Sequence, residues 1–340
     1  MPLPIYQEDG TTFRADSCQP LEQAVAGGQI RMESLVHGHY PGRRLPRNLL
    51  SGVKTVGYWD ADQSQDWGLD WHCNEGLELT FLERGTMGFA VDGQSWRLRP
   101  NDLTLTRPWQ RHRVGDPLVA AGRLHFLILD VAVRRPHQAW RWPTWLVLTR
   151  ADLAQLTEML RHNEQPVWHA SQEAGHCFRR IAHAVENDQQ GSQVSRLTVY
   201  LNELFVLVLD MLRQAQMPLD ASLSSSLRTV ELFWDDLCQH PDYLGMEWTV
   251  TAMARRCGLG LTHFIHHSKQ LHNMTPAQYL NFCRLQQAAS LLTQRPEMSV
   301  TQVAMQCGFS SGQYFATQFH RHFGYTPRDY RRRVPAENTS

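Results

Sequence analysis

A pattern that occurs twice in the last hundred residues constrains the fold of this chain more than any other feature. The pattern Ala-x-x-x-Gly at 254–258 recurs at 304–308, and Thr-Pro-x-x-Tyr at 275–279 recurs at 326–330. Alanine lets two helices cross closely, and glycine supplies the left-handed residue that ends a helix. Each copy therefore predicts two short helices joined by a turn.

Local signals bound both copies. Thr249 and Ser299 precede apolar-periodic segments, as helix-capping side chains do. After each turn a second helix is predicted, over 261–271 in the first copy and 311–323 in the second. The two helix-turn-helix units are predicted at about 249–272 and 299–323. In such a unit the second helix enters the DNA major groove, and a matched pair is far more specific than one copy.

The distribution of charge favours a polyanionic partner for this region. The whole chain has 33 basic and 33 acidic side chains. Ten basic and three acidic residues lie between Glu247 and Arg333, so this stretch carries +7 and the remainder −7. Such asymmetry is typical of a nucleic-acid-binding module joined to a module with another role.

Length and composition exclude several classes. A chain of 340 residues with 42% hydrophobic and 19% charged residues is neither disordered nor of low complexity, and it suffices for two or three domains. The first ten residues do not resemble a signal peptide, and no apolar run approaches the roughly 18 residues of a membrane span. The seven cysteines are scattered without a C-x-x-C pair. We therefore expect a cytoplasmic protein with reduced thiols, without membrane association.

The segment 68–129 predicts a small β-sandwich or barrel. Apolar residues alternate over 77–81, and a further strand over 87–91 ends at Asp92-Gly93, a strong hairpin signal. Short strands are also predicted at 96–98, 103–106 and 124–129. Many short strands at close spacing favour closed all-β architectures.

Helical periodicity replaces this pattern after about residue 150. The clearest stripe is Leu197, Leu201, Leu204, Val208 and Met211, which needs cover from a partner surface. The stripe predicts either a helix buried on its own domain or a homodimer interface, and the pattern does not separate the two. Residues 214–226, with Met217-Pro218 and a serine cluster, predict a linker.

The C-terminal region resembles the DNA-binding domain of AraC/XylS-type transcription regulators. The resemblance covers about residues 227–333 and is closest over 303–311, with Phe323-Gly324 and Thr326-Pro327. It implies two helix-turn-helix units joined by one long helix, here 277–292, that read adjacent major-groove segments of double-stranded DNA. The residues implied to face DNA are Thr262, Ile265, His266 and Lys269 in the first unit, and Gly312, Gln313, Ala316, Thr317 and His320 in the second. Gln313 suits adenine, because an amide can bond to N6 and N7 together.

The first recognition helix departs from the family pattern. His267 and Ser268 stand where an apolar residue and a phenylalanine are usual. The change predicts either altered contacts with bases or phosphates, sensitive to pH, or histidines without a DNA role in a loosely packed helix.

Residues 68–113 resemble the cupin-like sensor domain of the same regulators. The matching pieces are His72-Cys73-Asn74, Glu78, Gly85, 100–102 and 107–112. Metal-binding cupins have a histidine where this chain has Asn74, and an amide is a poor ligand for zinc or iron, so we expect no metal cofactor. The cluster predicts a structural polar network, an effector site or, least, a catalytic metal site. The candidate effector residues are His72, Asn74, Glu78, Trp109 and His112, the first three expected on one strand unless Gly76 marks a bulge.

Together these features predict a multidomain fold. An N-terminal all-β cupin-like barrel (double-stranded β-helix) with following helices precedes a C-terminal all-α domain with two helix-turn-helix units. The expected divisions are an extension over 1–55, the barrel over 56–149, a helical dimerisation region over 150–213, the linker over 214–226 and the DNA-binding domain over 227–333.

The expected function is sequence-specific transcription regulation in response to a small effector. Nine of the eleven tryptophans precede residue 170, and aromatic faces beside polar groups favour a sugar. The family resemblance implies activation as the output, with RNA polymerase as a further partner. The alternatives are a cupin-type metal-dependent dioxygenase or sugar isomerase with a helical appendage, and an architectural DNA binder without a ligand; we expect no enzyme activity.

Overall fold

The computed structural model describes residues 5–8, 11–14, 18–115, 118–215 and 217–333. The chain divides into two compact units, Met1–Ser224 and Ser225–Ser340, with the division inside the predicted linker. Part of that linker is ordered on the N-terminal unit, because the Asp220 amide donates to the His162 carbonyl at 2.8 Å and His162 Nε2 lies 2.8 Å from Ser224 Oγ. No helix among the described residues is long and apolar enough to cross a membrane.

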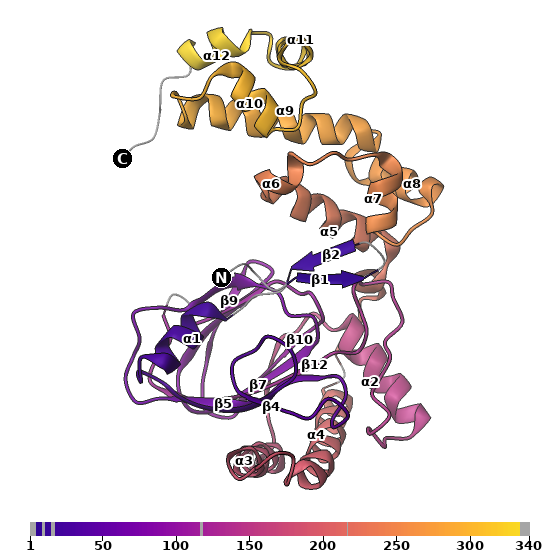
Figure 1. Ribbon diagram of the computed structural model, residues 1–340. Coiled ribbons are helices and arrows are strands. Elements are labelled where there is room, and N and C mark those ends of the chain that lie inside the picture. The colour runs from indigo at the N-terminus through magenta and orange to yellow at the C-terminus, as the bar shows by residue number, and fades with distance from the viewer. Residues whose placement is uncertain (1–4, 9–10, 15–17, 116–117, 216, 334–340) are drawn as a thin grey trace. The chain divides into compact units, whose positions relative to one another are not determined.

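Two sheets form the body of the N-terminal unit (Figure 1). The larger has the order β13-β10-β7-β12-β5-β3-β4, and the smaller β6-β11-β8-β9. Strands of the larger sheet are β3 (Arg31–Val36), β4 (Arg43–Arg44), β5 (Val53–Ala61), β7 (Leu77–Gly85), β10 (Asp102–Thr106), β12 (Gly122–Leu129) and β13 (Val167–His169). Those of the smaller are β6 (Leu69–His72), β8 (Met87–Val91), β9 (Gln94–Leu98) and β11 (His112–Val114), and β1 (Ile5–Glu8) pairs separately with β2 (Thr11–Arg14).

The larger sheet is buried on both faces, and the alternation along β7 shows how. Leu77, Leu79 and Phe81 belong to a core shared with the helices, whereas Leu82 belongs to a core shared with the smaller sheet. Because successive side chains of a strand point to opposite faces, Glu78 points the same way as Leu82, into the barrel.

The turns of the barrel follow the predicted signals. At the hairpin between β8 and β9, Asp92 and Gly93 both have positive φ, at 49° and 80°. The prediction of a separate extension over 1–55 is wrong in part, because β3 pairs along β5 within the larger sheet.

Three helices follow the barrel, α2 (Arg150–His162), α3 (Gln172–Glu186) and α4 (Val194–Gln214), and α1 (Gln19–Ala26) precedes it. The helices α3 and α4 lie side by side (Figure 1). The predicted interface residues Leu197, Leu201, Leu204 and Val208 are at most 1% exposed, and Met211 packs partly buried against the same core. This stripe covers the unit's own sheet, so the dimer-interface assignment of these residues is not retained.

The C-terminal unit is entirely helical among its described residues. Its helices are α5 (Ser226–Gln239), α6 (Pro241–Leu244), α7 (Val250–Arg256), α8 (Leu261–His272), α9 (Pro276–Gln294), α10 (Val300–Gln306), α11 (Gly312–Phe323) and α12 (Pro327–Arg333), and η1 (Ala221–Ser224) ends the preceding unit. Thr249 and Ser299 cap α7 and α10 through side-chain oxygens, as predicted. Gly258 and Gly308 follow with φ of 65° and 79°, the left-handed conformation that the repeat predicts.

One helix serves two hydrophobic cores. Leu280 and Cys283 of α9 pack with α5, α7 and α8, whereas Leu285 and Leu292 pack with α10 and α11. Cys283 also forms a disulfide with Cys238 of α5, so the prediction of reduced thiols is wrong for this pair. The two cysteines are 45 residues apart, and only the packing of the helices brings them together.

Candidate effector site and nucleic-acid interface

A buried polar cluster lies between the two sheets of the barrel. His72 and His112 are paired residues on β6 and β11 of the smaller sheet, and Glu78 comes from β7 of the larger sheet. The two imidazole rings are 4.3 Å apart, and His112 Nε2 lies 2.8 Å from Glu78 Oε2. Asn74 donates from Nδ2 to the same carboxylate oxygen at 2.9 Å, and Thr106 donates to it at 3.3 Å.

The members of this cluster were identified from the sequence, but the assignment of three of them to one strand is wrong. His72, Asn74 and Glu78 do not share one strand: β6 ends at His72, and β7 begins at Leu77 in the other sheet. Gly76 occurs in the connection, where a Cβ atom would lie 2.5 Å from the Leu129 carbonyl oxygen. The close passage of this backbone against β12 therefore needs glycine, and the chain crosses from one sheet to the other there.

The hydrogen bonds fix the charge of this cluster. Burial alone would raise the pKa of Glu78, but His112, His72 and the Asn74 amide outweigh it and hold the pKa below its ordinary value. The carboxylate is therefore ionised at neutral pH. His112 Nδ1 lies 2.9 Å from the Gln110 carbonyl oxygen, so each ring nitrogen of His112 faces an oxygen acceptor.

Two neighbouring residues connect this cluster to the surrounding loops. The Tyr40 hydroxyl lies 2.6 Å from Glu75 Oε2 and 3.1 Å from Asn74 Oδ1. Trp109 donates its backbone N–H to the Asn74 carbonyl at 2.8 Å and its indole N–H to the Val133 carbonyl at 2.7 Å. Tyr40 was not among the predicted site residues, because its segment carries no pattern that places it beside Asn74.

The donor set of this cluster does not match a metal site. No group of three or more His, Cys, Asp or Glu in the described ranges is arranged to hold a metal ion. Asn74 stands where metal-binding cupins have a histidine ligand, and its side-chain N–H donates to Glu78. The His112 nitrogens both lie close to oxygen atoms, Nδ1 to the Gln110 carbonyl and Nε2 to Glu78. One carboxylate oxygen, Glu78 Oε1, has no hydrogen-bond donor among the described residues.

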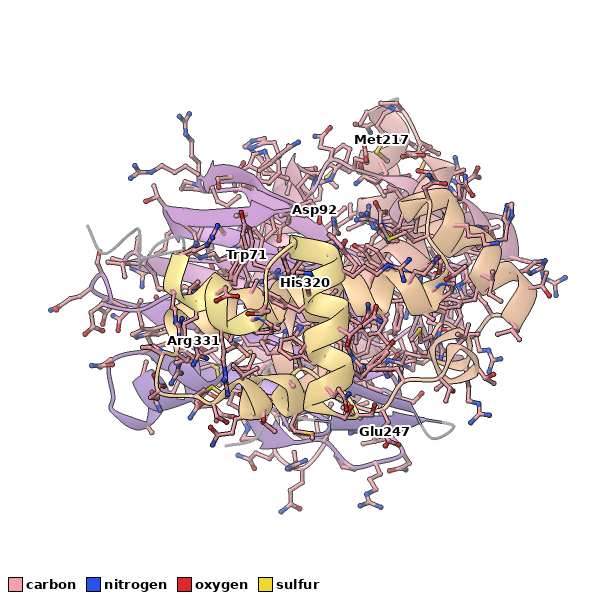
Figure 2. All side chains as sticks on the ribbon, turned by 90° about the horizontal axis from the view of Figure 1, so that it is seen from above. Trp71, Asp92, Met217, Glu247, His320 and Arg331 are labelled. Atoms are coloured by element: carbon pink, nitrogen blue, oxygen red, sulfur yellow. A yellow bond between two sulfur atoms is a disulfide. The ribbon has the colours of Figure 1, made fainter. Side chains whose placement is uncertain are left out.

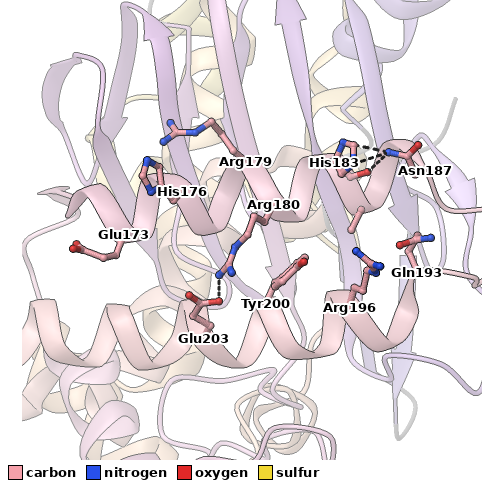
Figure 3. A pocket seen from close by; sticks show the side chains of 11 residues that line it. Glu173, His176, Arg179, Arg180, His183, Asn187, Gln193, Arg196, Tyr200 and Glu203 are labelled. Atoms are coloured by element: carbon pink, nitrogen blue, oxygen red, sulfur yellow. Dashed lines mark hydrogen bonds and ion pairs between the residues drawn. The ribbon is translucent and has the colours of Figure 1, made fainter.

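A groove of about 770 Å³ lies between α3 and α4 (Figure 3). Arg180 of α3 pairs across it with Glu203 of α4, and the Arg180 guanidinium also lies 4.5 Å from the centre of the Tyr200 ring. None of the predicted effector residues lines this groove.

The second helices of the two predicted helix-turn-helix units present the predicted DNA-facing residues to solvent. Thr262, His266 and Lys269 on α8 are exposed, and Ile265 is half-buried. On α11 the exposed residues are Gln313, Thr317 and His320, and Gly312 and Ala316 are half-buried. Figure 2 labels His320 on this helix. Thr317 donates its hydroxyl to the Gln313 carbonyl at 3.0 Å, which leaves its methyl group for other contacts.

Two exposed residues of α11 were missed as candidates. Tyr314 is 50% exposed, and Arg321 is exposed one turn beyond Thr317. The signal was available, because the buried Phe315 and Phe319 define the opposite face of the helix.

The structure explains the unusual core of the first unit. Ser268 stands at the position that Phe319 holds in the second unit, and both are fully buried. The indole of Trp234, from α5, occupies this core and donates from Nε1 to Ser268 Oγ at 3.2 Å. Trp234 also packs on Phe264, with ring centres 6.0 Å apart. The small side chain of Ser268 therefore leaves room for the indole ring of Trp234.

Comparison with known proteins finds relatives for both units. Residues 61–200 match an AraC-like ligand binding domain and residues 253–333 a helix-turn-helix domain. The HTH-type transcriptional activator RhaS of Shigella boydii serotype 18 is 27% identical over 261 residues, which are 76% of this chain and 86% of that protein. The RhaS protein of Escherichia coli O81 is 26% identical over the same length.

Solved structures superpose on this chain with low TM-scores. The DNA-binding domain of AdpA, in complex with a target DNA, has 28% identity over 31% of this chain and 90% of its own, with a TM-score of 0.29. ToxT from Vibrio cholerae, with a bound unsaturated fatty acid, has 13% identity over 86% of this chain and 100% of its own, with a TM-score of 0.38.

Proposed function

Because the chain belongs to the AraC-type family of transcription regulators, we propose that it is an effector-responsive activator that reads DNA with α8 and α11. The observation that carries this proposal is the pair of exposed recognition helices on a shared α9, in the basic part of the chain. The name of the RhaS relatives supports activation, and an activator also contacts RNA polymerase. Its place of action is the cytoplasm, with the DNA.

The two recognition helices have different chemistry and divide the work of recognition. On α11, the amide of Gln313 bonds to adenine N6 and N7, and the methyl groups of Ala316 and Thr317 contact thymine. On α8, Thr262, Ile265 and His266 face the bases and Lys269 pairs with a phosphate. Phosphate contacts supply most of the affinity, and base contacts supply the sequence preference.

The effector site is the cluster around Glu78, and its chemistry favours a sugar or related polyol. A ligand hydroxyl can donate to Glu78 Oε1, the carboxylate oxygen without a donor among the described residues. Trp109, whose backbone N–H donates to the Asn74 carbonyl, is the aromatic residue that we propose stacks on the ligand. Sugars combine apolar C–H faces with hydroxyl edges, so this pairing suits them. A metal-dependent enzyme is not the function we propose, because Asn74 and His112 both act as hydrogen-bond donors here.

We place a homodimer interface on the outer face of α4, opposite the buried stripe. Val199 and Val206 are 62% and 45% exposed two turns apart, and Val147 beside them is 78% exposed. The Val147 amide donates to Asn202 Oδ1 at 2.7 Å, which holds this valine against α4. Replacing Val199 and Val206 by glutamate should convert a dimer into a monomer in light scattering, and a wild-type monomer would contradict the assignment.

Thermal unfolding with a panel of mono- and oligosaccharides tests the effector proposal. A ligand at a hundredfold excess over its Kd stabilises by about 2.7 kcal/mol, which raises the unfolding temperature of a unit of this size by roughly 5–10 °C. The shift should disappear in Glu78→Gln and persist in Glu203→Gln, a matched change in the groove between α3 and α4. If the shift survives in Glu78→Gln, the sugar binds at another site. If no sugar produces a shift, the proposed effector class is excluded.

DNA binding is tested by selecting duplexes from a random pool with the purified protein. A regulator should enrich one sequence pattern and lose affinity steeply with salt. Enrichment of no pattern despite such salt dependence would favour an architectural DNA binder instead.

A further inference from the structure

The disulfide between Cys238 and Cys283 encloses the whole first helix-turn-helix unit. Its two cysteines are 45 residues apart, and α6, α7 and α8 all lie between them. Cys238 is in the last turn of α5, and Cys283 is near the middle of α9. The bond therefore closes a covalent loop around one complete DNA-reading element.

The helices that the bond joins are those that support α8. Trp234 of α5 packs on Phe264 and bonds to Ser268, and Leu280 of α9 belongs to the same core. The second unit has no disulfide among its described residues, and its recognition helix is held by Phe315 and Phe319. The covalent bond thus occurs in the unit whose recognition helix lacks the second phenylalanine.

Exposure separates Cys238 from the other thiols of the C-terminal unit. Cys238 is only partly buried, whereas Cys257 and Cys307 are each 1% exposed. Burial raises the pKa of the Cys307 thiol to about 12, and of Cys177 in the N-terminal unit likewise to about 12. Because the thiolate is the reactive form, a small disulfide reagent meets an accessible sulfur at Cys238 and unreactive thiols at these buried positions.

We propose that Cys238 and Cys283 are a reversible redox site, and that its oxidised form holds the first helix-turn-helix unit in its DNA-reading conformation. The oxidant is a low-molecular-weight disulfide such as glutathione disulfide. The Cys238 thiolate attacks it, forms a mixed disulfide and releases one glutathione; the Cys283 thiolate then displaces the second. Two protein thiols and one glutathione disulfide thus give one protein disulfide and two glutathione molecules.

The chemistry of the compartment supports reversibility. Proteins that act on DNA in a reducing cytoplasm rarely keep structural disulfides, and those that form there are generally transient or redox-sensing. The consequence for DNA reading rests on the proposed function, whereas the thiol chemistry and the stability of the unit do not.

The first measurement counts thiols in the full-length protein. After treatment with glutathione disulfide and alkylation in denaturant, five of the seven cysteines should react, and the peptides of Cys238 and Cys283 should be protected. After treatment with dithiothreitol, all seven should react. Glutathione adducts on the partly exposed Cys18 and Cys73 are recognised by their added mass and leave the count for the pair unchanged. Seven reactive thiols in both states, or Cys238 and Cys283 peptides that are not joined to each other after oxidation, would overturn the proposal.

The second measurement compares unfolding temperatures of the oxidised and reduced protein. Closing a loop of this length should raise the unfolding temperature of the C-terminal unit by about 10 °C or more. Cys238→Ser should melt at the reduced temperature under both conditions, and Cys18→Ser, in the N-terminal unit, should respond like the wild type. The wild-type comparison needs no variant, so poor folding of Cys238→Ser does not weaken it. Equal melting of the two wild-type forms would refute a stabilising role.

The third measurement is binding of a duplex selected by the protein, at a temperature between the two melting points. The oxidised form should bind at least about tenfold more tightly, and Cys238→Ser should show no difference between conditions. If neither form binds any duplex, the proposed function fails, while the thiol count and melting still decide the redox site. Equal binding by both forms would show that the bond does not control DNA reading.

Discussion

Replacing His112 by phenylalanine tests the electrostatic account of the barrel cluster. His112 Nε2 lies 2.8 Å from Glu78 Oε2, and the His112 side chain is 1% exposed. Two unit charges at this distance attract by about 6 kcal/mol at an effective dielectric constant of 20, and part of this offsets their desolvation. Removing one partner of a buried ion pair costs about 3–5 kcal/mol, because the other charge stays buried alone. We expect His112→Phe to lower the free energy of unfolding of the N-terminal unit by that amount.

Two companion variants separate charge from packing. Glu78→Gln keeps an acceptor for Asn74 and Thr106, and the imidazole that remains can be neutral near pH 7, so this change should cost only about 1–2 kcal/mol. The double variant Glu78→Leu/His112→Phe removes both charges and should be more stable than His112→Phe alone. A double variant that is no more stable than His112→Phe would refute the description of the pair.

Urea denaturation followed by tryptophan fluorescence measures these differences, since nine tryptophans precede residue 170.

The pH dependence of the free energy of unfolding tests the same account independently. The pKa of Glu78 is lower in the folded state, so its stabilisation is present above its ordinary pKa and is lost as pH falls through the lowered value. In His112→Phe, burial without the neighbouring imidazole raises that pKa, so stability should instead fall as pH rises from the ordinary pKa through the raised value. Parallel pH profiles would contradict the reasoning.

Three further predictions concern the C-terminal unit. Gln313→Ala should weaken binding to a selected duplex by about 1–3 kcal/mol and relax the preference at one base pair, as measured by competition with single-base variants. Lys269→Ala should lower affinity equally for all duplexes and reduce the slope of log K against log salt by about one, which anisotropy titrations at several salt concentrations measure. Gly308→Ala should lower thermal stability by more than about 2 kcal/mol, because its Cβ would lie 2.7 Å from the Gly245 carbonyl oxygen. Gly324→Ala, at a similar φ of 76° in open space, should cost only about 1 kcal/mol, and equal losses would contradict the steric argument.

The elements of the C-terminal unit could be predicted from sequence because their signals are local. A capping side chain such as Thr249 and a left-handed glycine such as Gly258 act within a few residues of the helix that they bound. The disulfide could not be predicted, because contact of Cys238 with Cys283 depends on how α5 and α9 pack. The compensation of Ser268 by Trp234 also joins residues distant in sequence.

The barrel was predicted less completely, for a related reason. The alternation around Glu78 identified its strand and the face on which it lies. The crossing of the chain between sheets at Gly76 was not predicted, since it depends on the approach of β12. The stripe through Leu204 showed that one face of α4 is buried, but an apolar pattern does not reveal whether a sheet or a second subunit covers it.

The single helix α9, shared by two hydrophobic cores, fixes the distance and the angle between α8 and α11. Each residue added to an α-helix turns the remainder of the helix by about 100° and advances it by about 1.5 Å. An insertion between Cys283 and Leu285 would therefore turn α11 relative to α8, and with it the groove segment that the proposed function assigns to α11. Regulators with a flexible tether tolerate a variable gap between the two parts of their site. If α8 and α11 read DNA as proposed, the length and phase of α9 set this gap, and operator spacing and α9 must change together.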